Sequence, residues 1–155
     1  MLRVGLIGNG GIAGNHKGAY RTLPSVKLEA ICDVHAEQLL QTEGLRTYTD
    51  YLQMLEQEQG RLDFVDLCVP TALHAEISIK AMEMGYHVLC EKPMARTVEQ
   101  AQAMLDVSSR TVQRQSDYYQ RRDRVCQQRR QTGGAVKIKS GRDFDLFRFL
   151  VDMGS

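Results

Sequence analysis

The feature that most constrains the fold is a glycine-rich turn that follows the first apolar run of the chain. Residues 2–7 are a short β-type run, and the sequence Gly-Asn-Gly-Gly-Ile-Ala at positions 8–13 leads from it into a helical stretch. In such a turn Gly8 permits the tight bend, Gly10 leaves the backbone open to a phosphate, and Ala13 lets helix and strand pack closely. Glycines also cluster in ordinary turns, but a strand, this spacing and a helix in succession are typical of dinucleotide-binding domains.

Strand and helix patterns alternate over the first 109 residues. The run 63–69 is nearly all apolar, as in a strand that is covered on both faces. The expected strands are 2–7, 26–32, 47–49, 63–69 and 86–90, and the expected helices end near residue 23 or cover 35–43, 50–59, 72–84 and 97–109. Short connections between alternating elements predict an α/β fold, a Rossmann-type doubly wound parallel sheet with helices on both faces.

An acidic residue follows the glycine turn at the distance that a dinucleotide site requires. Asp33 ends the second expected strand, twenty residues after Ala13, where a carboxylate can accept hydrogen bonds from the adenosine ribose. This negative charge repels a 2′-phosphate and favours NAD over NADP, although His35 nearby partly relieves the repulsion. The alternative is an aspartate that belongs to an ordinary turn at the end of a strand.

Composition limits the classes of protein. The chain has 155 residues and a formal net charge of +1, so its overall charge predicts attraction neither to nucleic acid nor to membranes. No apolar run reaches the roughly 18 residues of a membrane span, and the N-terminus lacks the layout of a signal peptide, which predicts a cytoplasmic protein. No two of the four cysteines form a Cys-x-x-Cys pair, so we expect buried thiols and no metal-binding residues.

Three segments, taken together, resemble the Gfo/Idh/MocA family of oxidoreductases, and the likeness covers roughly residues 1–109. They are Val4–Ala13 with His16 just beyond, Asp66–Thr71 followed by His74, and Gly85–Ala95, which contains Glu91-Lys92-Pro93. The resemblance implies an NAD(P)-dependent enzyme that transfers hydride between a nicotinamide cofactor and a sugar, a polyol or a similar hydroxyl-bearing metabolite. Its partner would be a small molecule, and homo-oligomers occur in such families.

The resemblance also implies the residues of the site. Glu91 and Lys92 would lie beside the nicotinamide, since open α/β sheets bind ligands at the carboxyl ends of their strands. Lys92 is the expected catalytic residue, because it could handle the hydroxyl proton of the substrate. Alone, it would be interpreted as a surface lysine before a turn proline. The expected cofactor-binding residues are Gly8, Gly10, Gly11, Ile12, Ala13, Asp33, Val69, Pro70, Thr71, His74, Glu91 and Lys92.

The last part of the chain departs from the family pattern. Residues 110–155 are expected to be an Arg/Gln-rich segment and a C-terminal helix over 143–151, a remnant of the family's second α/β domain or partly disordered. The stretch 133–146 resembles a faded Asp-x-x-x-His motif, with Ile138 and Arg142 in the places of the two catalytic residues. We therefore expect a Rossmann domain without a complete second domain, its C-terminal part truncated or divergent.

Two alternatives to an active enzyme remain open. The departures just described favour a catalytically incomplete dinucleotide-binding module, which would be a sensor or a truncated remnant. The arginines between residues 110 and 130 could also bind nucleic acid or an acidic partner, but no nucleic-acid fold signature accompanies them, so a solvated charged face is the better interpretation.

Overall fold

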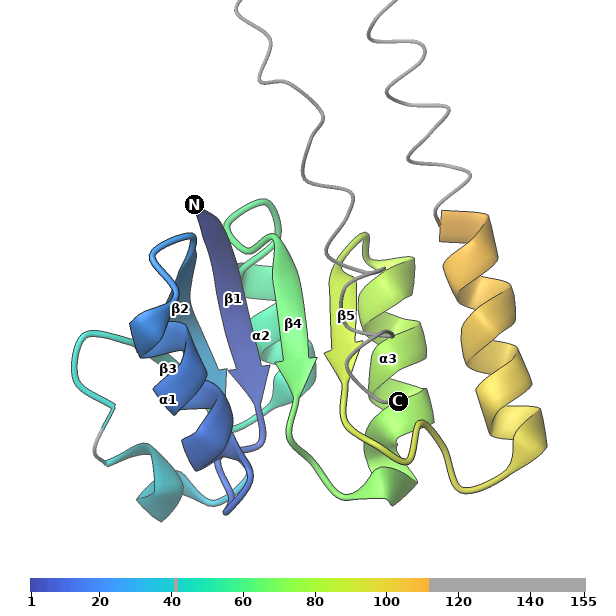
Figure 1. Ribbon diagram of the computed structural model, residues 1–155, viewed down its shortest axis with the longest axis horizontal. Helices are drawn as coiled ribbons and strands as arrows, with labels where there is room; N and C mark the ends of the chain where they lie inside the picture. Colours follow the sequence, from blue (N-terminus) through green and yellow to red (C-terminus); the bar gives the residue numbers. More distant parts are fainter. Residues whose placement is uncertain (41, 112–155) are drawn as a thin grey trace, which may run out of the picture. The chain divides into compact units, whose positions relative to one another are not determined.

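The computed structural model describes residues 1–40 and 42–111, in which five strands form one parallel sheet (Figure 1). The order of the strands across the sheet is β3-β2-β1-β4-β5. All four neighbouring pairs are parallel, so every arrow in Figure 1 points the same way. The strands are β1 (Leu2–Ile7), β2 (Val26–Cys32), β3 (Arg46–Tyr48), β4 (Phe64–Leu67) and β5 (His87–Cys90). The predicted fold class is confirmed.

The helices follow the strands in alternation, as the sequence predicts. They are α1 (Ala13–Thr22), α2 (Tyr51–Gln57), α3 (His74–Glu83) and a helix over residues 98–111, with short 3-10 turns at η1 (Ala36–Leu39) and η2 (Thr71–Leu73). Within the described ranges, no helix combines the length and the apolar character that crossing a lipid bilayer would require. The expectations for residues 112–155, including the 143–151 helix, lie outside the described part, and the domain boundary near residue 109 stays a prediction.

The helix expected over 35–43 was wrong, because the chain makes only the four-residue turn η1 there. Two side chains outside this segment bond to its backbone, and the bond from Asn9 to a carbonyl explains the difference. Asp33 accepts a hydrogen bond from the His35 N–H, and the Asn9 amide donates to the Gln38 carbonyl. A carbonyl that is already bonded to a side chain is a poorer acceptor for the next turn of a helix.

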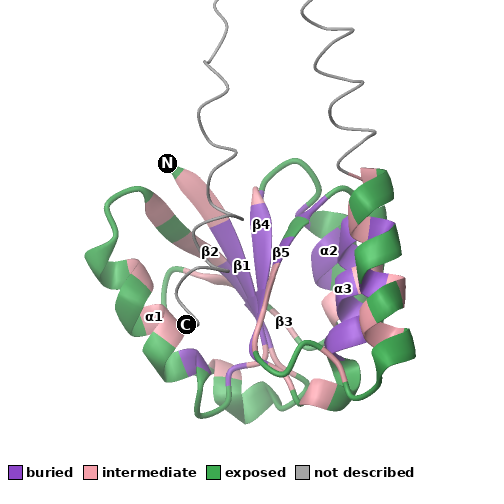
Figure 2. Ribbon diagram, turned by 45° about the vertical axis from the view of Figure 1, so that its right-hand side comes forward, coloured by how far each residue is buried: buried purple, intermediate pink, exposed green. Residues whose placement is uncertain are grey.

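The two faces of the sheet are covered by different helices. Ile7, Val65 and Leu67 point into the larger core cluster, together with residues of α2, α3 and the 98–111 helix. Leu6 and Ile31, their neighbours along the strands, face the other way and pack against Ala13 of α1. Figure 2 shows α1 on one side of the strands and α2 and α3 on the other. Successive side chains of a strand point to opposite faces of the sheet, so neighbouring residues of one strand contribute to the two different clusters.

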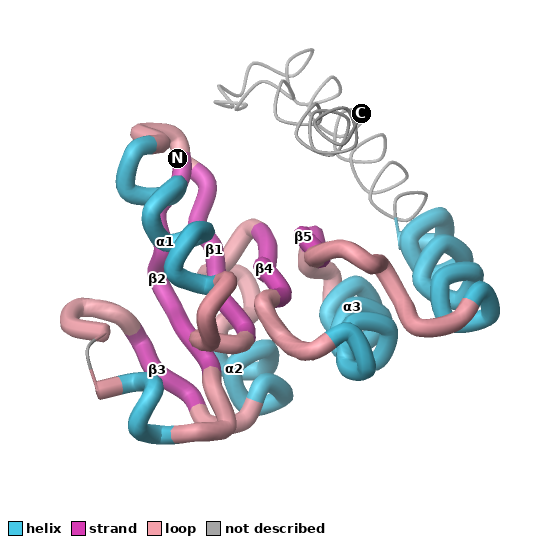
Figure 3. The backbone as a smooth tube through the Cα atoms, turned by 60° about the horizontal axis from the view of Figure 1, so that its bottom comes forward, coloured by secondary structure: helices cyan, strands magenta, loops and turns pink. Residues whose placement is uncertain are grey.

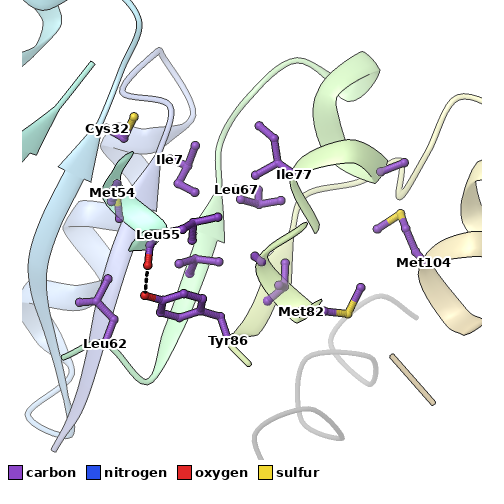
Figure 4. Close-up of a cluster of buried hydrophobic side chains, with 14 of the residues drawn as sticks. Ile7, Cys32, Met54, Leu55, Leu62, Leu67, Ile77, Met82, Tyr86 and Met104 are labelled. Carbon is purple, nitrogen blue, oxygen red and sulfur yellow. Dashed lines mark hydrogen bonds between the residues drawn. The ribbon is translucent and has the colours of Figure 1, made fainter. Parts of the chain in front are cut away.

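Residues from distant parts of the chain close the larger cluster. The Tyr86 ring reaches into it, and its hydroxyl donates to the Leu55 carbonyl at 2.7 Å (Figure 4). Met104, on the helix over 98–111, is also buried in this cluster. The helix that follows β5 is therefore part of the same folded unit as the sheet.

The order in which successive strands are added to the sheet reverses at its centre, although all strands run in the same direction. From β1 the chain goes to β2 and β3 on one side, and it then crosses over to β4 and β5 on the other. In doubly wound folds a ligand crevice forms at such a point, outside the carboxyl ends of the strands. Figure 3 brings this edge forward, with the loops that follow β1, β4 and β5 beside one another.

Gly8 joins the two halves of the sheet at this edge. Its N–H donates to the Cys32 carbonyl, and the Cys68 N–H donates to the Ile7 carbonyl, both at 2.8 Å. Gly8 has a φ of +93°, and a Cβ there would lie 2.5 Å from the Cys68 carbonyl oxygen. A side chain at this position would therefore collide with backbone as well as force a disfavoured conformation.

We expect Gly8→Ala to lower the free energy of unfolding by at least about 1–3 kcal/mol, because the backbone at Gly8 or Cys68 must move. Urea denaturation followed by circular dichroism measures the change. Gly10→Ala is the control, since nothing lies within 4 Å of a Cβ at Gly10 and its φ is not in the left-handed region. Equal stability of the Gly8→Ala and unmodified chains would contradict the tight approach.

Candidate functional site

The glycine turn leaves backbone donors unused at the start of α1. No hydrogen bond within the described part of the chain engages the N–H groups of Gly10, Gly11 and Ile12. These three residues are exposed, and a Cβ at Gly10 or Gly11 would meet no atom within 4 Å. Ala13, by contrast, is fully buried where α1 packs on the sheet. The turn therefore offers an open group of N–H donors at the positive end of a helix, which is suited to an anion such as a diphosphate.

Asp33 lies directly beside this turn. Its carboxylate accepts hydrogen bonds from the Asn9 N–H at 2.7 Å and from the His35 N–H at 2.9 Å. The first bond joins the end of β2 to the turn after β1, which places the expected ribose acceptor next to the expected phosphate donors. Both bonds fix the orientation of the carboxylate, while a carboxylate keeps lone pairs for further donors.

The Asn9 side chain makes a second connection that the sequence did not reveal. Lys17 of α1 donates to its carbonyl oxygen at 2.6 Å, and its amide donates to the Gln38 carbonyl. Asn9 is almost fully buried. It therefore links α1, η1 and the glycine turn, and it positions the turn without facing the open side itself.

The segment after β4 carries four of the expected cofactor-binding residues. Val69 and Thr71 are half-buried, and Pro70 between them is exposed. A Cβ at Gly8 would lie 3.0 Å from the Val69 side chain, so this segment runs beside the glycine turn. The structure thus brings the first two motifs of the sequence together at the carboxyl edge.

His74 has a different environment from the other expected site residues. Its side chain is buried, with Nδ1 at 2.9 Å from the Pro93 carbonyl oxygen and Nε2 at 2.9 Å from the Val69 carbonyl oxygen. The imidazole therefore connects the loop after β4 to the loop after β5. Its assignment as a cofactor-binding residue stays a prediction, and its contacts are those of a link between two loops.

The third motif, Glu91-Lys92-Pro93, begins where β5 ends. The Lys92–Pro93 peptide bond is cis, and Lys92 is exposed. Glu91 is half-buried and uses both carboxylate oxygens: Oε1 lies 2.9 Å from His16 Nε2, and Oε2 accepts the Lys92 N–H at 3.1 Å. The expected catalytic lysine thus follows directly after a carboxylate that is hydrogen-bonded to His16 of α1.

His16 of α1 lies between two carboxylates. Its Nδ1 is 2.7 Å from Asp66 Oδ2, and the Tyr20 hydroxyl donates to the same oxygen at 2.6 Å. Burial on its own lowers the pKa of His16, but the attraction of Asp66 and Glu91 outweighs it and raises that pKa above its ordinary value. The pKa of Glu91 is lowered, because the bonds from His16 and the Lys92 N–H outweigh its burial.

A metal-ligand reading of this region fits the donors poorly. Ligand atoms of His16, Asp66 and Cys68 lie within 4.8 Å of one another. However, His16 and Asp66 are already hydrogen-bonded, and burial raises the pKa of the Cys68 thiol to about 12, so the thiol keeps its proton. These residues form a hydrogen-bonded network and not a set of free ligands.

The sequence contained a signal for this network. Asp66 is the one charged residue in the buried strand Phe64–Leu67, and its side chain is fully buried. A buried carboxylate requires hydrogen-bond donors, so partners on the covering helix could have been sought. Tyr20 and His16 are four residues apart on α1, on one face of the helix.

We expect His74→Leu to lower the free energy of unfolding by about 1–3 kcal/mol, since the buried polar contact between the imidazole and the loops after β4 and β5 is lost. Urea denaturation provides the measurement. His35→Leu is the matched control, because the His35 side chain is 70% exposed and its replacement should change stability by less than about 0.5 kcal/mol. The link between the loops is refuted if both variants unfold at the urea concentration of the unmodified chain.

Comparison with known proteins agrees with this geometry. Residues 2–116 match the model of the Gfo/Idh/MocA oxidoreductases, described as an oxidoreductase family with an NAD-binding Rossmann fold. The chain is 32% identical to glucose-6-phosphate 3-dehydrogenase of Bacillus subtilis, over 71% of this chain and 31% of that protein. It thus spans about a third of the length of such relatives.

Solved structures give the same result with bound cofactors. The WlbA dehydrogenase of Bordetella pertussis, in complex with NADH and UDP-GlcNAcA, is 34% identical with a TM-score of 0.67, over 71% of this chain and 34% of that one. KijD10, a 3-ketoreductase from Actinomadura kijaniata in complex with NADP and TDP-benzene, is 29% identical with a TM-score of 0.64, over the same shares of the two chains. From its three motifs, its parallel sheet and these matches, the chain belongs to the Gfo/Idh/MocA family of NAD-binding oxidoreductases.

Proposed function

We propose that this chain is the nucleotide-binding part of an NAD(P)-dependent oxidoreductase that acts on a sugar, a polyol or a similar hydroxyl-bearing metabolite. The observation that carries the proposal is the set of N–H groups at Gly10, Gly11 and Ile12, which no residue of 1–40 or 42–111 engages at the exposed start of α1. A diphosphate needs donors and positive potential together, and a helix start supplies both. We place the NAD(P)-binding domain at residues 1–109.

The arrangement of the remaining residues supports a dinucleotide in preference to a simple phosphate. Asp33 lies on one side of the turn, suited to the adenosine ribose, and the loop Val69–Thr71 lies on the other. Glu91 and Lys92 follow the neighbouring strand at the same edge of the sheet. These positions could hold the two halves of an extended cofactor along the carboxyl edge, with the diphosphate at the centre.

The substrate class is supported by the relatives. Glucose-6-phosphate 3-dehydrogenase carries a sugar in its name, and the WlbA dehydrogenase was crystallised with a nucleotide sugar. Both relatives are named as dehydrogenases. We extend this chemistry to the present protein, and we place it in the cytoplasm, where homo-oligomers of such enzymes could form.

The chemistry divides between cofactor and protein. When bound, the nicotinamide ring supplies the acceptor or donor of a hydride. Lys92 is proposed to accept the proton of the substrate hydroxyl as an amine when the substrate is oxidised, and to donate it as an ammonium when the substrate is reduced, because its exposed side chain lies at the carboxyl edge of the sheet. Glu91, held by His16, would keep a negative charge beside it.

We expect Asp33→Asn to weaken NADH binding by roughly 10- to 100-fold, because a charged acceptor of the ribose hydroxyls is lost. NADPH should lose less affinity, since the repulsion of its 2′-phosphate is also removed. Isothermal titration calorimetry with both cofactors gives the ratio of affinities. Glu37→Gln is the control, with a side chain that is 69% exposed on the adjoining turn. An equal loss of affinity for NADH and NADPH would point to a disturbed turn and contradict the ribose contact.

We expect Lys92→Ala to leave NADH affinity within a few-fold of the unmodified chain and to lower turnover about 10²- to 10⁴-fold, the usual effect of losing a general acid or base. A panel of sugars and polyols with NAD, followed at 340 nm, measures turnover. Lys80→Ala on α3 is the control, since Lys80 is also exposed. Binding of NADH without turnover of any substrate would favour the dinucleotide-binding module, and failure to bind NADH at millimolar concentration would refute the proposed function.

A further inference from the structure

We infer that His16 is a positioning residue: its imidazole, held between Asp66 and Glu91, fixes the Glu91 carboxylate and through it the backbone at Lys92. Three elements meet at this imidazole, because His16 is on α1, Asp66 is in β4 and Glu91 follows β5. A single side chain thus connects the helix that begins at the glycine turn with the segment that carries the lysine.

The geometry determines how the imidazole is protonated. Its Nδ1 lies 2.7 Å from Asp66 Oδ2 and its Nε2 lies 2.9 Å from Glu91 Oε1. Burial raises the pKa of Asp66, while the bonds from Tyr20 and His16 favour its charged form. Beside two ionised carboxylates, which accept hydrogen bonds, both ring nitrogens donate, and only an imidazolium has two N–H groups. A neutral ring would leave one nitrogen lone pair facing a carboxylate. We therefore assign the proton of this network to His16.

The surroundings favour the charged ring. The titratable groups around it are Lys17 and Tyr20 on α1, Asp66 and Cys68 at β4, and Glu91 after β5. The Lys17 ammonium is bonded to the Asn9 side chain, and the Cys68 thiol is protonated. The two carboxylates are thus the charges that act most directly on His16, and both attract a proton.

The network reaches Lys92 through one further bond. Glu91 Oε2 accepts the Lys92 N–H at 3.1 Å, while Oε1 is occupied by His16. The side chain of Glu91 is only 28% exposed, and with both oxygens bonded it has one orientation. When His16 loses its proton, the ring keeps one N–H for two carboxylates. If that N–H stays with Asp66, Glu91 Oε1 loses its donor and the Lys92 N–H alone holds the carboxylate.

Asp66 alone does not explain His16. The Tyr20 hydroxyl already donates to Asp66 Oδ2, and the Tyr20 ring packs against Phe64 at 6.4 Å between centroids. A second donor to the same oxygen needs only one polar hydrogen, whereas the imidazole also reaches a second carboxylate with its opposite nitrogen. Any effect of this positioning on a bound nicotinamide rests on the proposed function. The positioning of Lys92 itself can be tested without cofactor.

The test follows the Lys92 amide signal and the histidine ring nitrogens by ¹H–¹⁵N NMR of the full chain from pH 5 to 9. We expect the Lys92 amide to shift as the pH rises through the raised pKa of His16, with a midpoint above 6.5, the ordinary histidine value. His16→Gln should abolish this shift, because the glutamine amide can donate to a carboxylate but has no proton to lose. Glu91→Gln should lower the pKa of His16 by about one unit or more, since one opposite charge is removed.

Tyr20→Phe is the matched control. It removes a donor from the same Asp66 oxygen and keeps the ring, so it tests whether any disturbance of Asp66 reaches Lys92. We expect the Lys92 amide to keep its pH response in this variant. A Lys92 signal that titrates in His16→Gln as it does in the unmodified chain, or that loses its titration equally in Tyr20→Phe, would overturn the inference.

Cofactor binding separates this inference from the proposed function. If the unmodified chain binds NADH, we expect the affinity of His16→Gln to become independent of pH over the range in which the Lys92 amide titrates. If the unmodified chain does not bind NADH, the proposed function fails, and the cofactor-free titrations still decide whether His16 positions Lys92.

Discussion

The close approach of the chain at Gly8 is the constraint on which the carboxyl edge of the sheet depends. The N–H of Gly8 bonds to the end of β2, and its missing side chain leaves room for the Cys68 carbonyl after β4. Because β1 is the central strand, this contact sets how the two halves of the sheet meet. The open N–H groups of Gly10, Gly11 and Ile12, the position of Asp33 and the course of the Val69 loop all lie at the edge that this contact forms.

Two histidines hold the loops of this edge together from within. His74 lies between the carbonyls of Val69 and Pro93, and His16 lies between the carboxylates of Asp66 and Glu91. Glu91 and Pro93 flank Lys92 in the sequence. The segment that carries the expected catalytic lysine is thus bonded on both sides of that residue to side chains from earlier helices. Loops generally move more than the elements that they connect, so such bonds give a lysine on a loop a defined place.

The sequence predicted the strands and the fold class because their signals are local. Alternating apolar runs, the glycine turn and the buried run 63–69 each carry a pattern of their own, and β1 and β2 have the predicted bounds. The segment 35–43 was mispredicted because a bond from Asn9, which is distant in sequence, occupies the Gln38 carbonyl. The links made by His16 and His74 were missed for the same reason: residue type shows that a histidine can bond, but only the fold shows its partners.

The bond between Asp33 and the Asn9 N–H couples the preference for NAD or NADP to the binding of the diphosphate. The carboxylate that would discriminate between NAD and NADP also restrains the turn whose neighbouring N–H groups would hold the phosphates. Evolution or engineering of a preference for the 2′-phosphorylated cofactor therefore cannot treat position 33 as an independent choice. A switch to a side chain without an acceptor oxygen would need a second change that restores an acceptor for the Asn9 N–H, so those two changes should arise as a pair.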